Sequence, residues 1–378
     1  MTRCDIVLGI DPRFTGGTAA ALLADAEAFL DLGLTLGLIF VTSEFFQGAG
    51  DAPNPNLIAL GAHDGVEIIA PGSTVSCDLA FLHHPLAFAS PFPEIFSLTA
   101  HRVVLVAHHP CFRGDGSLEY NPVLVARNIR DGLGVDVDWA PVSGVVRAQL
   151  RSFCPLIRLT SADWGNLFDP RGWQASRPAF DGARPVVGRH SRPDRLKWPS
   201  TAQTVADSLT AGPDWRVRVM GWPEDDFPFH VDADHWEVVP FNGIPVPDFL
   251  NGIDVFAYHF SDLWVEAFGR TITEAMLMER PCLLDPRLDA TFGDLATYCA
   301  PAEVAGHLER LRADPETART RAREVRAQVV AHMSAAAIAP RLEALRRDTG
   351  TRSRAGTKTA APFTALRKAI GLMRRSRG

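Results

Sequence analysis

The sequence has little lysine, and its cysteines are scattered. Only three of its 38 basic residues are lysines, Lys197, Lys358 and Lys368. None of the six cysteines forms a Cys-x-x-Cys pair, so neither a zinc site nor a disulfide framework is expected. No window reaches about 18 uncharged apolar residues, which argues against a membrane-spanning helix. The first residues also lack the regions of a secretion signal, and we therefore expect a cytoplasmic protein.

What the sequence does contain is the composition of a globular protein with an uneven charge. Hydrophobic residues make up 46% and charged residues 22% of the 378 residues, and the length suits two domains. The net charge is -6, but residues 341–378 hold eleven basic and two acidic side chains, which leaves -15 for the rest. Because nucleic-acid affinity comes largely from basic side chains, no nucleic-acid partner is expected for the acidic residues 1–340.

Short β-rich runs alternate with helix-like stretches in two series, a pattern typical of parallel sheets covered by helices. In the first series the predicted strands are 5–10, 36–42, 79–83, 102–107 and 156–160, with helices at 18–32 and 122–131 between them. In the second series they are 185–189, 215–220, 236–239, 253–258 and 281–285. The predicted fold class is α/β, with two Rossmann-like, doubly wound sheets in tandem.

A segment rich in Gly, Pro, Asp and Trp, residues 163–185, reads as the linker between two domains. We predict domains at 1–175 and 176–347, the second ending in helices from residue 301, one of them starting near Asp314-Pro315-Glu316. Residues 348–378 are predicted to be a disordered basic tail.

The tail also allows a second interpretation. Phe363, Leu366, Ile370 and Met373 fall at helical spacing among basic residues. Residues 349–378 are therefore also a candidate for contact with an anionic membrane surface.

The most informative stretch follows the predicted strand 253–258. The helix-forming run around Glu274 begins near Gly269 or Arg270, where a glycine lets a ligand approach and first-turn N–H groups bind an anion. Glu266 and Glu274 would repel phosphate but suit the hydroxyls of a ribose or hexose. The alternative is that Glu274 pairs with Arg270 on a solvated helix face and that Glu266 is an ordinary loop acid.

These residues form the run E-A-F-G-R-T-I-T-E-A-M at 266–276, which R-P-C-L-L follows at 280–284. The run resembles the C-terminal signature of retaining glycosyltransferases of GT-B fold and family 4 type. Glu279-Arg280 departs from the small pair that the family more often has there. The resemblance implies two Rossmann-like lobes facing a cleft, a C-terminal helix crossing back, and a nucleotide-sugar donor bound by Phe268, Gly269, Arg270 and Glu274, with Glu266 at the sugar.

A second match lies at the start of the second series. The run from Val187 to Pro199 resembles the family's first strand and loop of the donor domain, and the resemblance assigns the clamping of the donor diphosphate to Arg189 and Lys197. The gap between them is longer than usual, so Arg195 or Arg192 could replace Lys197. Lys197 is favoured as the single lysine before the tail. The alternative is an ordinary solvated basic loop.

The third match is the loop after the first strand, where Gly16-Gly17 resembles the family's N-terminal Gly-Gly loop beside the donor phosphate or the acceptor. The absence of a G-x-G-x-x-G motif argues against a dinucleotide site. His109 is the candidate for the histidine that the family often places near the donor sugar, although a cleft-wall residue is equally consistent. Two His-His-Pro segments, at 83–85 and 108–110, each end a predicted strand.

The resemblance implies a glycosyltransferase that retains configuration and elongates a surface or lipid-linked glycan. No Asp-x-Asp follows a strand where a metal-dependent enzyme would carry it, so neither a metal nor another cofactor is expected. A non-catalytic two-lobed binding or scaffold protein and a GT-B epimerase remain alternatives. A phosphorylase would need a lysine for pyridoxal phosphate, and lysine is scarce.

Overall fold

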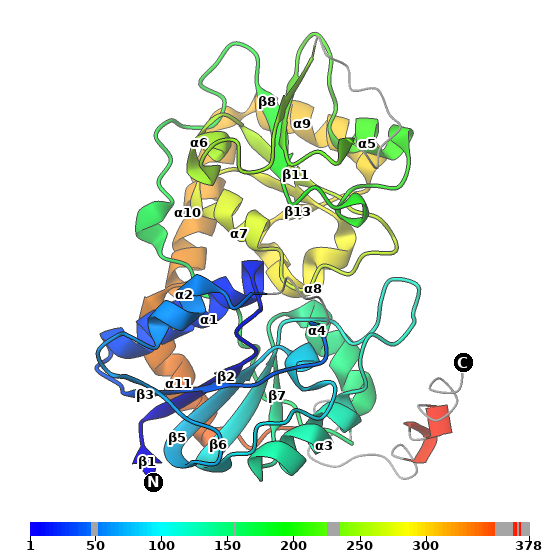
Figure 1. The fold of residues 1–378 in the computed structure, drawn as a ribbon. Coiled ribbons are helices and arrows are strands. Elements are labelled where there is room, and N and C mark those ends of the chain that lie inside the picture. Colours follow the sequence, from blue (N-terminus) through cyan, green and yellow to red (C-terminus); the bar gives the residue numbers. More distant parts are fainter. Residues whose placement is uncertain (47–51, 155, 225–234, 352–365, 369, 372–378) are drawn as a thin grey trace. The chain divides into compact units, whose positions relative to one another are not determined.

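The computed structural model describes residues 1–46, 52–154, 156–224, 235–351, 366–368 and 370–371. The chain divides into two compact units (Figure 1). Unit 1 comprises Met1–Leu167 and Ala335–Gly378, and unit 2 comprises Phe168–Ser334.

Unit 1 is built on a parallel sheet in the order β4-β3-β2-β5-β6-β7, with β1 paired to β5. The strands are β1 (Thr2–Arg3), β2 (Ile6–Ile10), β3 (Leu36–Phe40), β4 (Val66–Ile68), β5 (Thr74–His83), β6 (Ser97–Ala107) and β7 (Asp138–Pro141). All five residues of β2 are buried, as expected for a central strand covered on both faces.

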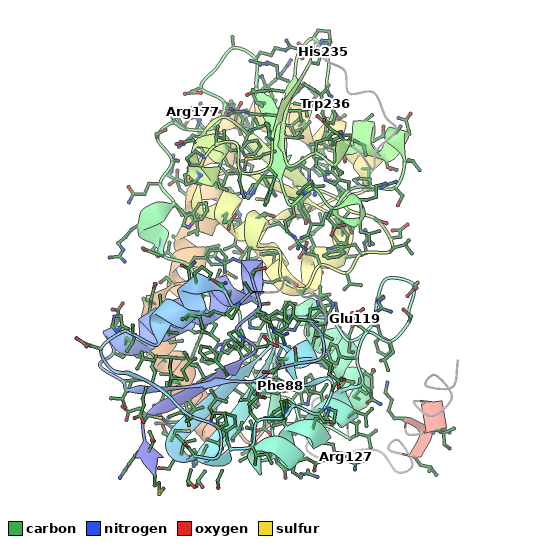
Figure 2. The ribbon with its side chains drawn as sticks, viewed as in Figure 1. Phe88, Glu119, Arg127, Arg177, His235 and Trp236 are labelled. Carbon is green, nitrogen blue, oxygen red and sulfur yellow. The ribbon has the colours of Figure 1, made fainter. Side chains whose placement is uncertain are left out.

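The helices of unit 1 are α1 (Gly16–Asp31), α2 (Pro55–Leu60), α3 (Pro122–Leu133), α4 (Gly144–Leu150) and α11 (Ile338–Arg347). The Asn121 side chain caps α3 by accepting from the Val123 N–H, and the helix ends at Gly134 in the left-handed conformation. Phe88 (Figure 2) is fully buried in the core of this unit.

Unit 2 repeats the plan with a six-stranded parallel sheet in the order β10-β9-β8-β11-β12-β13. Its strands are β8 (Val186–His190), β9 (Arg216–Met220), β10 (Trp236–Val239), β11 (Val255–Tyr258), β12 (Cys282–Leu284) and β13 (Thr297–Tyr298). Its helices are α5 (Ala202–Ser208), α6 (Val246–Asn251), α7 (Arg270–Leu277), α8 (Asp289–Phe292), α9 (Val304–Ala313) and α10 (Pro315–Met333). The Asp314 side chain caps α10, where that helix was predicted to start.

The division between the units falls at 167/168 rather than at the predicted 175/176. Phe168 already packs in unit 2, because its ring lies 6.3 Å from that of Phe268 and beneath the Arg270 guanidinium. Arg177 (Figure 2), within the predicted linker, pairs with the buried Asp254 of the same unit at 2.8 Å. After Ser334 the chain returns to unit 1, which includes α11.

The predicted strand at 156–160 is wrong. Leu159 forms only single bridges, to Trp139 and Thr351, and the strand beside β6 is β7. β7 begins with an acidic residue, Asp138, which is buried only because Arg102 and Arg158 pair with it. These partners are distant in sequence, so the local pattern did not indicate a buried strand.

Both sheets reverse their strand order beside their first long strand, between β2 and β5 in unit 1 and between β8 and β11 in unit 2. Ligands of open α/β sheets bind outside the carboxyl ends of the strands at such a switch point. The predicted fold class, two Rossmann-like parallel sheets in tandem, is confirmed.

Only part of the tail is described. Phe363 and Met373 lie outside the described residues, whereas Leu366 and Ile370 are exposed. Membrane contact through 349–378 stays a prediction. In the described ranges, no helix combines the length and apolar character needed to cross a membrane.

Candidate functional site

The helix start predicted near Gly269 is observed. Gly269 caps α7 in the left-handed conformation, with φ of 82°, and a Cβ at this position would lie 2.8 Å from Cδ1 of Ile272. Phe268 is buried beside it, and Arg270 opens the helix with its guanidinium 4.3 Å from the centre of the Phe168 ring. The first N–H groups of a helix have no partner within the helix, so this end can bind an anion.

A buried ion pair precedes this helix. Nζ of Lys197, in the loop after β8, lies 3.0 Å from Oε2 of Glu266, in the loop after β11. The same oxygen accepts hydrogen bonds from the Tyr258 hydroxyl at 2.7 Å and from Nε1 of Trp264 at 3.3 Å. The two charged side chains are only 13% and 9% exposed. Glu266 is therefore not an ordinary loop acid, and the loop of Lys197 is not merely a solvated one.

The surroundings keep both partners charged. Burial disfavours the charge on Lys197, but the Glu266 carboxylate outweighs it and raises the pKa of the lysine to about 12. Burial likewise opposes the charge on Glu266, yet Lys197 and the Tyr258 hydroxyl lower the pKa of this carboxyl below its ordinary value. The pair thus presents a cation and an anion at neutral pH.

Arg189 lies behind this pair. Its Nη atoms donate to the carbonyl oxygens of His259 and Lys197, each at 2.6 Å, and its guanidinium lies between the rings of Trp198 and Tyr258. Burial lowers its pKa to about 10, so it remains charged at neutral pH. The described contacts make Arg189 a brace that fixes the backbone of Lys197, and direct contact with a diphosphate stays a prediction.

The two arginines considered in place of Lys197 are arranged differently. Arg195 donates to the carbonyl oxygens of Pro199 and Ser200. The Arg192 side chain is 65% exposed and lies 4.0 Å from Asp194. Of the three basic residues in this loop, the one seen paired with Glu266 is Lys197.

Glu274 lies inside unit 2 and not on a solvated helix face. Its side chain is 13% exposed, and Oε2 lies 3.4 Å from Nε2 of His190, the last residue of β8. Burial raises the pKa of Glu274 to about 7, although the nearby Arg270 charge lowers it. The carboxyl therefore changes its protonation near neutral pH.

A hollow of about 380 Å³ opens at the carboxyl ends of the neighbouring strands β8, β9 and β10. Three of its lining residues are prolines, and the exposed ring of Phe241 offers a flat apolar surface. The lining residues are Pro193, Trp222, Pro223, Glu224, Val238, Val239, Pro240 and Phe241. Pro193 belongs to the same loop as Lys197, so the hollow and the ion pair share the carboxyl edge of one sheet.

The predicted glycines of unit 1 open its longest helix. Gly16 and Gly17 are exposed at the start of α1, and Gly16 has a φ of 62°. The preceding Phe14 lies at the switch point, with its ring 4.2 Å from that of His84. The Gly-Gly loop and one histidine segment therefore meet at the carboxyl edge of this sheet.

The two histidine segments also meet there. Nδ1 of His83 lies within hydrogen-bond distance of Nε2 of His108, at 3.0 Å. The centres of the His84 and His109 rings lie 5.7 Å apart. The carbonyl of His109 accepts from the Tyr120 hydroxyl at 2.7 Å. Burial holds the pKa values of His83 and His84 well below their ordinary value, so both rings are neutral.

Within the part of the chain that the structure describes, no three His, Cys, Asp or Glu side chains are arranged to hold a metal ion. Metal independence itself stays a prediction.

Sequence reasoning missed Tyr258, Trp264 and His190. The signal for His190 is strand alternation: it follows Arg189 directly on β8, so the two side chains point to opposite faces of the sheet. Tyr258 ends β11 at the same edge, but its contact with Glu266 depends on how the following loop turns back. No local pattern predicts such a contact.

Among the comparisons with known proteins, the one with solved structures finds matches, and these support the fold. No protein-family model matches the sequence, and a search of curated proteins finds no match. The structure resembles Alr3699/HepE of Anabaena in complex with UDP-glucose, with 15% identity, 90% of this chain and 98% of that chain covered, and a TM-score of 0.57. The complex of HepE with UDP gives 16% identity, coverages of 91% and 98%, and a TM-score of 0.58.

A glycosyltransferase from Rickettsia africae shares 11% identity over 91% of this chain and 98% of that chain, with a TM-score of 0.55. Likeness at this level of identity establishes the fold alone, since one fold hosts many functions.

Proposed function

We propose that this chain is a glycosyltransferase that moves a sugar from a nucleotide-diphosphate sugar to an acceptor hydroxyl. The observation that carries the proposal is the buried ion pair of Lys197 and Glu266, of which Glu266 stands three residues before the helix-capping Gly269. A cation, a carboxylate and helix amides at one switch point suit a ligand that joins a diphosphate to a sugar. The fold shared with HepE, which was crystallised with UDP-glucose, supports the proposal.

In this proposal unit 2 stabilises the leaving diphosphate. Negative charge grows on the phosphate oxygen as its bond to the anomeric carbon breaks. Lys197 remains protonated at neutral pH, and the first amides of α7 add the positive end of the helix dipole. The buried charge of Arg189 lies behind them and holds the backbone of Lys197 in place.

The carboxylates would hold the sugars. Glu266 accepts hydroxyl groups of the transferred sugar, and Glu274 accepts those of the ribose. The nucleobase would occupy the hollow after β8, β9 and β10, against the exposed ring of Phe241. The contacts expected of Gly16, Gly17 and His109 with the donor sugar or the acceptor rest on the sequence resemblance alone.

The resemblance of the run at 266–276 supports the finer features of the proposal. We include retention of configuration: the bond from C1 to the diphosphate breaks, the acceptor oxygen bonds to the same face of C1, and its proton leaves with the diphosphate. We also include a mechanism without a metal. The proposed acceptor is a growing surface or lipid-linked glycan, which residues 349–378 would help to reach at an anionic membrane.

The test is release of nucleotide from UDP-, GDP- and ADP-sugars by the full chain, with and without EDTA. One donor should yield free nucleotide at an EDTA-independent rate. Lys197→Ala should lower that rate about 100- to 1000-fold, because the leaving group loses its cation. Arg192→Ala, in the same loop but largely exposed, is the matched control and should leave the rate unchanged.

The two alternatives give different results in this assay. A non-catalytic scaffold would bind nucleotide in a thermal-shift measurement but release none from any donor. An epimerase would change the sugar configuration without an added acceptor, which proton NMR of the products reveals.

A further inference from the structure

A buried nitrogen without a hydrogen-bond partner points at Glu274. Nε2 of His190 lies 3.4 Å from Oε2 of Glu274, and within the described structure it makes no hydrogen bond. The histidine is 5% exposed, and its ring is fixed edge-on against Phe249 of α6 and Phe256 of β11. A polar atom this deeply buried normally has a partner, and Glu274 is the acceptor within reach.

The charges around the pair decide which form each partner takes. Burial, followed by the charges of Arg189 and Lys197, lowers the pKa of His190 to about 3, so its ring is neutral. A neutral imidazole carries one N–H, which can stand on Nε2 and donate to the carboxylate. Asp248, the acidic residue of α6, is exposed and does not oppose this arrangement.

We propose that His190 is a positioning residue for Glu274: its neutral ring donates a hydrogen bond that favours the ionised form of the carboxylate and orients it to accept the ribose hydroxyls of the donor. This role rests on the proposed function, in which Glu274 binds the ribose. It gives the two neighbouring residues at the end of β8 different roles, because Arg189 fixes the backbone of Lys197 whereas His190 contacts Glu274 of α7.

The role predicts a pH dependence of donor binding. A protonated Glu274 offers one acceptor fewer to a pair of hydroxyls, so its protonated form binds the donor more weakly. Burial raises the pKa of Glu274 to about 7, with the Arg270 charge opposing. Donor affinity should therefore be about tenfold lower at pH 6 than at pH 8.

The key variant is His190→Phe, which keeps a ring between Phe249 and Phe256 but removes the N–H. At pH 7 the donor KM should rise about tenfold with little change in kcat at saturating donor. The pH midpoint of donor binding should move up by about one unit. His190→Gln, whose amide can donate, should restore most of the affinity. In a Glu274→Gln background His190→Phe should have no further effect on donor binding.

His259→Gln is the matched control, because His259 is also buried at the end of a strand of this sheet but its Nε2 meets the carbonyl of Cys299. It should leave the pH midpoint unchanged. Calorimetric titration with UDP and GDP between pH 5.5 and 8.5 gives the midpoint independently of turnover.

The outcomes separate the two proposals. If the wild-type chain binds neither nucleotide and releases none from a donor, the proposed function fails. If it binds but His190→Phe keeps both the affinity and the pH midpoint, the positioning role is overturned. A loss that is equal at every pH and that Gln does not rescue would assign His190 to packing alone, which also overturns it.

Discussion

The carboxyl edges of the two sheets share a topology but treat charge differently. In unit 2 the edge buries Arg189, Lys197 and Glu266 in their charged forms. In unit 1 the corresponding edge holds His83 and His84 as neutral rings. Burying charge is costly unless it is paired, so an edge that keeps several charges is suited to a charged ligand.

Unit 1 does carry one buried ion pair at this edge, and its surroundings differ. The Asp11 carboxylate binds Arg13 at 2.7 Å and also accepts hydrogen bonds from the backbone and hydroxyl of Ser43. In unit 2, by contrast, the Glu266 oxygen nearest Lys197 depends on two side chains, Tyr258 and Trp264. The unit 1 pair is completed by the backbone N–H and hydroxyl of Ser43, 32 residues away in sequence, whereas the described hydrogen bonds to Glu266 in the unit 2 pair all come from side chains.

The largest predicted effect breaks the unit 2 pair. Lys197→Met leaves Glu266 buried without its cation and should cost about 3–5 kcal/mol of unfolding free energy. Adding Glu266→Gln should recover most of this loss, because the buried charge is gone. Urea unfolding of wild type, single and double variants measures both steps.

Arg13→Met is the comparison in unit 1. Asp11 keeps a backbone N–H donor as well as the Ser43 hydroxyl, whereas the donors left to Glu266 are the side chains of Tyr258 and Trp264, so this loss should be smaller than that of Lys197→Met. Equal losses in the two units, or no recovery in the double variant, would contradict the difference drawn between the two edges.

The second prediction concerns the pH dependence of stability in unit 2. The folded pKa of Glu274 is about 7, above the ordinary 4.5, so the folded state binds a proton more tightly than the unfolded chain. The stability from this group is complete below pH 4.5 and is lost as pH rises to about 7. Glu274→Gln has no such loss and should be more stable than wild type by roughly 3 kcal/mol at pH 8, with no gain at pH 4.5.

Denaturant unfolding at the two pH values checks this prediction. A variant that is equally displaced from wild type at pH 4.5 and pH 8 would mean that Glu274 titrates near its ordinary value. Glu316→Gln, on the exposed first turn of α10, is the control for the substitution itself.

The third prediction concerns unit 1, where stability should be lost as pH falls rather than as it rises. Burial lowers the pKa of His84, so the unfolded chain takes up a proton below about pH 6.5 that the folded state refuses. Stability from this group is therefore lost as pH falls. His84→Asn should reduce the loss by about 1.4 kcal/mol at pH 5.5, relative to pH 8. Asparagine tolerates the positive φ of 73° and can also accept from the Leu86 N–H.

Thermal or urea unfolding between pH 5.5 and 8 measures this slope. The exposed His63→Asn serves as the control in the same unit. If His84→Asn loses as much unfolding free energy as wild type between pH 8 and pH 5.5, the loss comes from other groups. This difference between the two units would then not hold.

The sequence predicts the features that depend on residues close together in the chain and misses those that depend on distant ones. The start of α7 at Gly269 and Arg270 and the cap of α10 at Asp314 are local, and both were predicted correctly. The strand β7 was missed because Asp138 is buried by arginines far away in the sequence.

The candidate site divides in the same way. The chemical types of Lys197 and Glu266 were readable from the motif, but their mutual pairing was not, because it joins loops 69 residues apart. Tyr258 and Trp264 complete that contact and carry no pattern of their own. Local chemistry is thus predictable from sequence, whereas the partners that fix its charge state come from tertiary structure.

The smallest predicted effect compares one residue with a positive φ from each unit. Glu279, after α7, has a φ of 56°, and His84, after β5, has a φ of 73°, a region that favours glycine. Glu279 stands where the resembling family more often has a small residue. Glu279→Gly should therefore raise the free energy of unfolding by about 1 kcal/mol. The loss of the attraction between the Glu279 carboxylate and Arg280 reduces this gain.

His84→Gly should not give the same gain. The imidazole packs 4.2 Å from Phe14 and accepts from the Leu86 N–H, and glycine forfeits both contacts. Urea unfolding at pH 8 measures the free energy of unfolding of both variants, because histidine protonation does not affect the result at that pH. If both variants are more stable than wild type, the contacts of the His84 ring contribute less than its positive φ costs. If neither is more stable, the surroundings of Glu279 relieve the cost of its positive φ. The expected opposite signs follow from one difference: the ring of the strained residue in unit 1 makes two contacts within its unit, whereas the strained residue of unit 2 only ends a helix.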